Sequence, residues 1–427
     1  MISYLKQHYV RVSFLFLFIF SGAPILMAQV VDTCPQTDLP DVVSSWLNKE
    51  PKEKADGEGS LILLPIIGSN PATGFMIGVG GQYAFKMPES SHYSLISGSI
   101  QFTTKKQFIA MLKNTIYSRN DKIFLTGDWR FLIFSQSTYG LGTNSPEGGI
   151  LDYQFGLGGS EVSSDSLTQP MGFNFARLHQ SIGFKLRKNM YLGLGYRYDG
   201  YFKIDDKKLS LTPGDTLLTS HYAYNTNYGF ATDSYYNSAI TANFVIDTRD
   251  NMINAYSGYY LNLGWLGAFE VVGNRNNTNI LDFEWRSFHG LSKSNPAHLL
   301  AFWVLGTFTE SGDLPYMILP ATAYDQRGRS ARGYTQGRFR GESMMYAEAE
   351  YRFPITGCGG LLSGVLFVNA ASASNNYQSL ALLDAIKPGY GFGLRLMADK
   401  SSRTNLAIDF GFGEKSFGFY LAASETF

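Results

Sequence analysis

The chain has 427 residues with 35 basic and 35 acidic side chains, so a formal net charge of zero gives no electrostatic attraction toward nucleic acid. Charged residues make up 16% of the sequence and aromatic residues 15%, whereas soluble domains carry about 25% charged residues. This composition argues against an ordinary water-soluble protein and indicates a large surface that does not face water.

The N-terminus has the organisation of a secretory signal peptide. A basic start is followed by an apolar run at 12–20 and by Ala28, a small residue suited to cleavage. A membrane anchor is the alternative, but the run is shorter than the roughly 20 residues that a spanning helix needs. We therefore predict a signal peptide over 1–28, followed by a short periplasmic N-terminal segment and linker over 29–60.

Beyond the signal peptide, apolar residues alternate with small or polar residues. The segments 75–86, 343–354 and 390–397 show this pattern, which is typical of strands that face lipid on one side and a polar lumen on the other. No apolar run approaches helical spanning length, and backbone groups in lipid must be paired internally, so a closed barrel is expected. A soluble β-sandwich or propeller is the alternative, but the continuous aromatic-rich face opposite Gly, Glu, Arg, Asn and Asp favours the membrane barrel.

We predict an all-β fold, a transmembrane antiparallel β-barrel of about sixteen strands over 61–427. The strands are expected at 61–68, 73–86, 91–103, 107–117, 121–135, 172–187, 190–203, 236–248, 257–271, 278–291, 297–309, 343–354, 361–371, 388–398, 403–413 and 416–427. The longest connections follow the fifth, seventh, eleventh and thirteenth strands. They therefore lie on one side, as the outer loops of a barrel with periplasmic termini do.

Four segments of the second half occur in a characteristic order. They are Asp247–Asn251 with Ser257–Tyr260, Arg332-Gly333-Tyr334, Glu348–Pro354 and Phe367–Ala371. Together they resemble the BamA/TamA family of outer membrane barrels, also called the bacterial surface antigen superfamily. In that family the Arg-Gly-aromatic motif lies in the sixth outer loop, which folds back into the lumen.

The resemblance implies a lumen site around Arg332, Gly333 and Tyr334. A guanidinium in a confined polar lumen favours a bidentate carboxylate partner, and Glu350 lies on the lumen-facing side of its strand. Asn369 stands where the family has an aspartate and offers only a neutral hydrogen bond, so a weaker anchor for Arg332 is expected.

The family's assembly members carry periplasmic POTRA domains before the barrel. Residues 29–60 are too few for such a domain, because folded domains usually need at least about 50 residues. We therefore expect a member without POTRA domains, and this argues against a complete assembly machine.

The two cysteines, Cys34 and Cys358, both fall on the predicted periplasmic side, which is an oxidising compartment. A disulfide between them would tether the N-terminal segment to the barrel rim. Two unpaired thiols are the alternative.

The last residue, Phe427, is predicted to share one face of the final strand with Phe417 and Leu421. A terminal aromatic on an alternating last strand resembles the signal by which outer membrane barrels are recognised for insertion. A chance phenylalanine in an aromatic-rich chain is the alternative.

The motifs of common enzymes are not present in the sequence. There is no G-x-S-x-G elbow, P-loop or H-E-x-x-H, and the glycines at 78–81 are interpreted as lumen-facing strand residues. We expect no enzyme activity, no cofactor and no metal. A hidden active site at the barrel rim is the alternative.

The predicted location is the outer membrane, after signal peptide cleavage. The predicted function is outer membrane protein insertion, translocation or related transport, acting through a seam between the first and last strands. The expected partners are outer membrane lipid, the barrel assembly machinery during biogenesis, and outer membrane protein clients. The alternative is a passive or gated pore, or a surface-exposed structural barrel without assembly activity.

Overall fold

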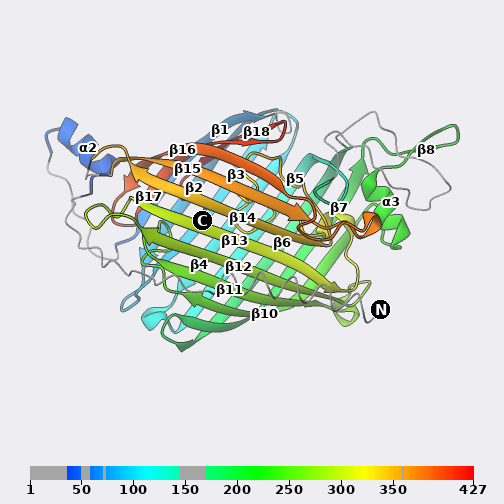
Figure 1. The fold of residues 1–427 in the computed structure, drawn as a ribbon, viewed down its shortest axis with the longest axis horizontal. Coiled ribbons are helices and arrows are strands. Elements are labelled where there is room, and N and C mark those ends of the chain that lie inside the picture. The colour runs from blue at the N-terminus through cyan, green and yellow to red at the C-terminus, as the bar shows by residue number, and fades with distance from the viewer. Residues whose placement is uncertain (1–35, 50–57, 71–73, 145–168, 358–359) are drawn as a thin grey trace.

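The computed structural model describes residues 36–49, 58–70, 74–144, 169–357 and 360–427. Sixteen of its strands form a single antiparallel sheet in which each strand pairs with its neighbours in chain order. Figure 1 shows these strands running side by side and obliquely along the molecule. The predicted all-β, sixteen-stranded antiparallel barrel is therefore confirmed.

The sixteen strands of the sheet are β1 (Ser60–Asn70), β2 (Gly74–Lys86), β3 (Tyr93–Thr103), β4 (Phe108–Tyr117), β5 (Ile123–Thr138), β6 (Gln169–Arg187), β7 (Met190–Asp206), β10 (Tyr235–Asp247), β11 (Gly258–Ala268), β12 (Thr278–Gly290), β13 (Leu299–Ser311), β14 (Ser343–Pro354), β15 (Leu362–Ala373), β16 (Lys387–Asp399), β17 (Thr404–Gly413) and β18 (Ser416–Ala422). The short strands β8 (Ser210–Thr212) and β9 (Asp215–Leu217) form a separate hairpin.

Side chains of the strands divide into an apolar exterior and a charged interior. On β16, Phe392 and Leu394 are exposed, whereas Arg395 is buried. On β14, Glu348 and Glu350 are likewise buried. Exposed apolar side chains suit lipid, and buried charges require partners inside the barrel.

The two ends of the barrel differ in their connections. The helix α3 (Ser220–Asn227) and the β8–β9 hairpin lie at one end, which we call the loop end, and the helix α2 (Leu39–Trp46) lies at the other, the turn end (Figure 1). Among the described residues, no helix is both long and apolar enough to span a membrane.

The helix α2 is fixed to the turn end of the barrel by polar contacts. Asp38 caps the helix, and a capping box joins it to Asp41. The same two carboxylates reach the turn between β16 and β17, where Asp38 accepts from the Lys400 backbone N–H at 2.9 Å and Asp41 pairs with the Lys400 ammonium at 2.7 Å.

The expectation of a closed barrel is corrected in one respect. The first and last strands share no backbone ladder in the part of the chain that the structure describes, so hydrogen bonding does not close the barrel. The sheet nevertheless curls round on itself. Gln82 of β2 donates to the Thr404 hydroxyl of β17 at 3.1 Å, although 322 positions separate these residues. The barrel therefore has one seam, between β1 and β18.

The C-terminal residues correct one prediction. The strand β18 ends at Ala422, and Phe427 does not share the exposed face of Phe417. Phe427 is 2% exposed and stacks on Trp303 with ring centroids 5.4 Å apart. The tail turns inward because Glu425 pairs with Arg395 in the lumen at 2.8 Å, which an outward-facing continuation of the strand would not allow.

The turn between β10 and β11, residues 248–257, folds across the turn end of the barrel. Asp250 pairs with Arg403 at 2.6 Å, and Asn251 donates to the Ser402 carbonyl at 3.2 Å. The buried Met252 belongs to an apolar cluster with residues of β2, β4, β5, β7 and β10. This turn therefore covers the lumen at the turn end of the barrel.

A second polar cluster at the turn end is centred on Asp121, between β4 and β5. Its carboxylate accepts hydrogen bonds from the hydroxyls of Ser90 and Ser91, the latter at 2.6 Å. Burial alone would raise the pKa of the Asp121 carboxyl. The hydrogen bonds from the two serines outweigh this effect and hold the pKa below its ordinary value.

Candidate functional site

The sixth outer loop, residues 312–342, enters the lumen and carries the Arg-Gly-Tyr motif to the wall. Gly333 has φ +105°, and a Cβ at this position would lie 2.7 Å from the Phe412 carbonyl carbon of β17. Its N–H donates to the Tyr420 hydroxyl at 2.9 Å. A glycine is required here because the backbone is left-handed and lies against another backbone.

Tyr334 fixes the next position of the motif. Its hydroxyl donates to the Pro388 carbonyl at 2.6 Å and accepts from the Glu414 N–H at 3.0 Å, so it joins β16 to the turn after β17. Its ring packs edge-on against Phe339 with centroids 4.8 Å apart. The tyrosine thus holds the loop against the last strands of the barrel.

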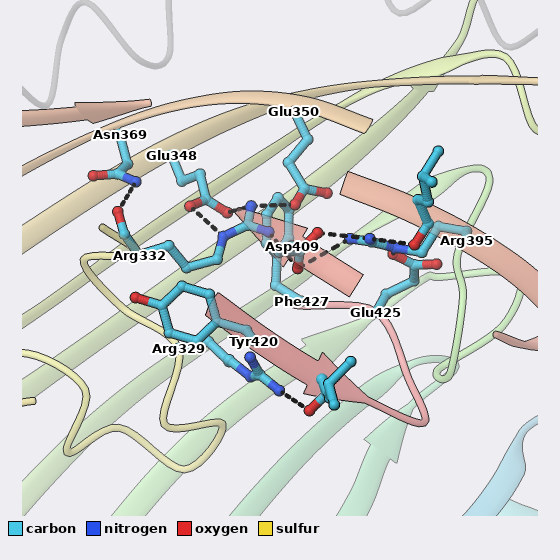
Figure 2. A network of polar contacts seen from close by, with 12 residues as sticks. Arg329, Arg332, Glu348, Glu350, Asn369, Arg395, Asp409, Tyr420, Glu425 and Phe427 are labelled. Carbon is cyan, nitrogen blue, oxygen red and sulfur yellow. Dashed lines mark hydrogen bonds and ion pairs between the residues drawn. The ribbon is translucent and has the colours of Figure 1, made fainter. Parts of the chain in front are cut away.

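Arg332 binds three carboxylates of the barrel wall (Figure 2). Its guanidinium makes a bidentate contact with Glu348 of β14, at 3.1 and 2.6 Å. The same group contacts Glu350 of β14, and donates to Asp409 of β17 at 2.9 Å. The guanidinium carbon, Cζ, lies 3.6 Å from the centroid of the Phe367 ring. Arg332 is 1% exposed, so water contributes little to its solvation.

The carboxylates around Arg332 have further partners, of which Figure 2 shows Arg395 beside Asp409. Arg352 pairs with Glu350 at 2.7 Å, and Arg395 pairs with Asp409 at 2.6 Å. Glu348 accepts from the Tyr346 hydroxyl at 2.5 Å. Each buried charge is therefore opposed by others, and the loss of one member would leave a charge uncompensated in a dry site.

The predicted site residues lie together, but Asn369 has a different part from the one expected. It does not contact the guanidinium. Its amide donates to the Arg332 backbone carbonyl at 3.0 Å, and Asp409 supplies the third carboxylate. The anchor therefore does not depend on a carboxylate at 369.

Glu348 and Asp409 were missed as candidate residues. Glu348 precedes Glu350 by two positions, and this spacing places both on the lumen face of β14. Asp409 alternates with outward-facing residues of β17, so its orientation toward the lumen could be predicted from the sequence. The proximity of Asp409 to Arg332 could not be predicted, because 77 positions separate the two residues. Cys34 and Cys358 lie outside the described residues.

Other arginines of the loop also lie inside the barrel. Arg340 is 1% exposed and donates to the carbonyls of Tyr316 and Met317 at 3.0 and 2.9 Å. Arg329 donates to the Leu421 carbonyl of β18 at 2.9 Å. These contacts stabilise the loop within the lumen. No cluster of metal-binding side chains occurs among the described residues.

Known proteins similar to this chain include solved structures and one family model. No curated protein matches the chain. A solved structure of BamA from Haemophilus ducreyi, lacking POTRA domains 1–3, matches with 13% identity and a TM-score of 0.51, covering 85% of this chain and 69% of that one. CdiB from Acinetobacter baumannii matches with 10% identity and a TM-score of 0.46, covering 86% of this chain and 60% of that one.

The family model for the Omp85 superfamily domain matches residues 129–427, which include the lumen site and twelve of the sixteen barrel strands in whole or part. This match confirms the resemblance inferred from the four sequence segments. The chain belongs to the Omp85 superfamily of outer membrane β-barrel proteins.

Proposed function

We propose that this protein inserts or translocates other proteins at the outer membrane, and that it acts at the seam between β1 and β18. Membership of the Omp85 superfamily supports a role of this kind. The observation that carries the proposal is that β1 and β18 do not pair with each other in the part of the chain that the structure describes, since the edges of such strands offer backbone groups to a client strand.

The filled lumen favours this function over a pore. The sixth loop is locked to the wall by Arg332, and the turn at 248–257 covers the turn end. A partly open cavity of about 270 Å³ lies beside the loop and is lined by residues of both the loop and the strands, among them Arg177, Asp282 and Asp325. A passive pore needs a continuous water-filled path through the lumen, and the sixth loop and the turn at 248–257 lie across that path. Action at the seam between β1 and β18 is therefore the better supported route.

The N-terminal segments of the chain have proposed roles of their own. Residues 1–28 act as a signal peptide, and residues 29–60 remain in the periplasm beside the barrel, which comprises 61–427. The contacts of α2 with Lys400 support a position of this segment at the turn end. The proposed partners are the barrel assembly machinery during biogenesis and unfolded outer membrane proteins as clients. No enzyme activity is proposed.

The test is to lock the seam covalently and measure client insertion. Single cysteines in β1, at 61–67, are paired with cysteines in β18, at 417–421, in a background with Cys34→Ser and Cys358→Ser, and the pair that crosslinks is selected. The purified protein is reconstituted into lipid vesicles. Folding of an added unfolded barrel protein is followed by protease protection, before and after reduction of the crosslink.

The matched control is a crosslink between Phe410→Cys and Phe419→Cys, which lie opposite each other in the paired strands β17 and β18. We expect the seam crosslink to abolish client folding until it is reduced, and the control crosslink to leave the rate unchanged. Equal client folding with the seam locked would refute action at the seam. No acceleration by the unlocked protein over empty vesicles would refute insertion altogether.

A further inference from the structure

The sixth loop touches the barrel wall in a second place, far from Arg332. Near its tip the carbonyls of Tyr324, Asp325 and Gln326 face the strands β5 and β6. Counted along the sheet, these strands are the fifth and sixth, whereas β14 and β17, which hold Arg332, are the twelfth and fifteenth. The two contact regions therefore lie on opposite walls of a sixteen-stranded barrel.

Two arginines of the wall make this second contact. Arg177 of β6 donates to the Tyr324 carbonyl at 3.0 Å. Arg130 of β5 donates to the Asp325 carbonyl at 3.1 Å. Both arginines are largely buried, so water competes weakly for these hydrogen bonds.

Each of these arginines uses one side of its guanidinium for an acid and another for the loop. The Arg177 Nε donates to Asp199 at 2.6 Å, while Nη1 reaches the loop. The Arg130 Nε donates to Asp128 at 2.7 Å, while Nη2 contacts both Asp128 and the loop. The carboxylates fix the orientation of the two planar guanidinium groups, so that the remaining N–H groups point toward the loop.

A local turn in the loop orients these carbonyls toward the wall. The Asp325 carboxylate accepts from the N–H groups of Arg327 and Gly328 at 2.9 and 2.7 Å, and from the Ser330 hydroxyl at 2.7 Å. Such an Asx turn satisfies the amide groups locally. The Tyr324 carbonyl accepts from Arg177, and the Asp325 carbonyl accepts both from the Gly328 N–H within the turn, at 3.1 Å, and from Arg130 of the wall.

We propose that Arg130 and Arg177 are positioning residues that form a second latch for the sixth loop, independent of the Arg332 anchor. The loop is thereby held between two opposite walls. Release of either latch alone leaves the other in place and keeps the loop in the lumen, and the loss of both removes the charged contacts of the loop with the two walls. The inference concerns the loop and holds whatever client the seam accepts.

The test uses lysine substitutions that keep the charge. A lysine ammonium is one compact group, so it can neutralise the wall acid but cannot occupy both the Nε and Nη positions. The test protein carries Arg130→Lys and Arg177→Lys. The control carries Arg197→Lys on β7, because Arg197 pairs with Asp282 and has no hydrogen bond to the loop among the contacts of the described chain. Both are reconstituted into vesicles, and amide hydrogen exchange is measured peptide by peptide.

We expect exchange in residues 321–331 to rise by roughly tenfold or more in the test protein, since two charge-assisted hydrogen bonds are lost. Exchange in β5 and β6 should not change, and the control should match the wild type. Equal exchange of the loop in test and control would overturn the proposal. A parallel rise throughout β5 and β6 would also overturn it, because it would show that the arginines only stabilise the wall.

Hydrogen exchange of Arg332→Ala gives a second readout. Because the two latches are independent, Arg332→Ala should raise exchange around residue 332 and leave residues 321–326 near the wild-type rate. The Arg130→Lys and Arg177→Lys protein should show the reverse pattern. A rise at 321–326 in Arg332→Ala as large as that in the lysine protein would refute an independent second latch.

Discussion

Removal of the Arg332 guanidinium should destabilise the barrel mainly through one acid, Glu348. In Arg332→Ala, Glu350 keeps Arg352 and Asp409 keeps Arg395 as ionic partners. Glu348, which is 4% exposed, keeps only a neutral hydroxyl. Breaking a buried ion pair on one side costs about 3–5 kcal/mol, and we expect a loss of this size in the free energy of unfolding.

A second substitution tests the assignment to Glu348. The change Glu348→Gln in the Arg332→Ala background removes the uncompensated charge and should recover about 1–3 kcal/mol. The matched change Glu350→Gln should recover less, because it leaves Arg352 without its acid. Stability is measured by urea unfolding of the protein in lipid vesicles, followed by tryptophan fluorescence and extrapolated linearly to zero denaturant.

Two results would refute this reasoning. A loss below about 1 kcal/mol in Arg332→Ala would mean that the ion-pair cluster does not hold the loop. Equal recovery by Glu348→Gln and Glu350→Gln would mean that the two acids share the uncompensated charge, contrary to the contacts of Arg352.

Three further perturbations test other parts of the structure. Phe427→Ala should cost about 3–5 kcal/mol in urea unfolding, with Phe427→Leu recovering most of it, and wild-type stability of the alanine variant would contradict the inward tail. Gly333→Ala should lower the unfolding midpoint, whereas Gly290→Ala, where a Cβ meets open space, should not, and equal midpoints would exclude strain at 333. The lowered pKa of Asp121 stabilises the fold above the unfolded value of about 3.8, and this stabilisation disappears as pH falls through the lower folded pKa. Asp121→Asn should therefore be less stable than wild type at neutral pH and lose less on acidification, and parallel pH profiles would contradict this.

The strands were predictable because lipid imposes a strict alternation on them. The expected segment 343–354 coincides with β14, and 190–203 falls three residues short of the end of β7. Polar side chains near the ends of the longest strands, such as Asp205 and Asp206, do not distinguish a strand from a loop, so ends of this kind were placed too early.

The pairing inside the lumen was only partly predictable. The motif and the alternation placed Arg332 and Glu350 in the lumen. Which acid meets which arginine depends on how the loop crosses the barrel, and alternation contains no information about that. The inward turn of Phe427 was missed for a related reason, since a phenylalanine fits an apolar exterior and an aromatic interior equally well.

The double attachment of the sixth loop also has a consequence for how the barrel is made. Arg130 and its acceptor Asp325 are 195 positions apart, and Arg177 and Tyr324 are 147 apart. Contacts between such distant positions form slowly, because a long stretch of chain must first be ordered. Neither wall can receive the loop until the strands of both halves face each other. Docking of the loop should thus be the slow final event of folding, later than membrane insertion of the strands.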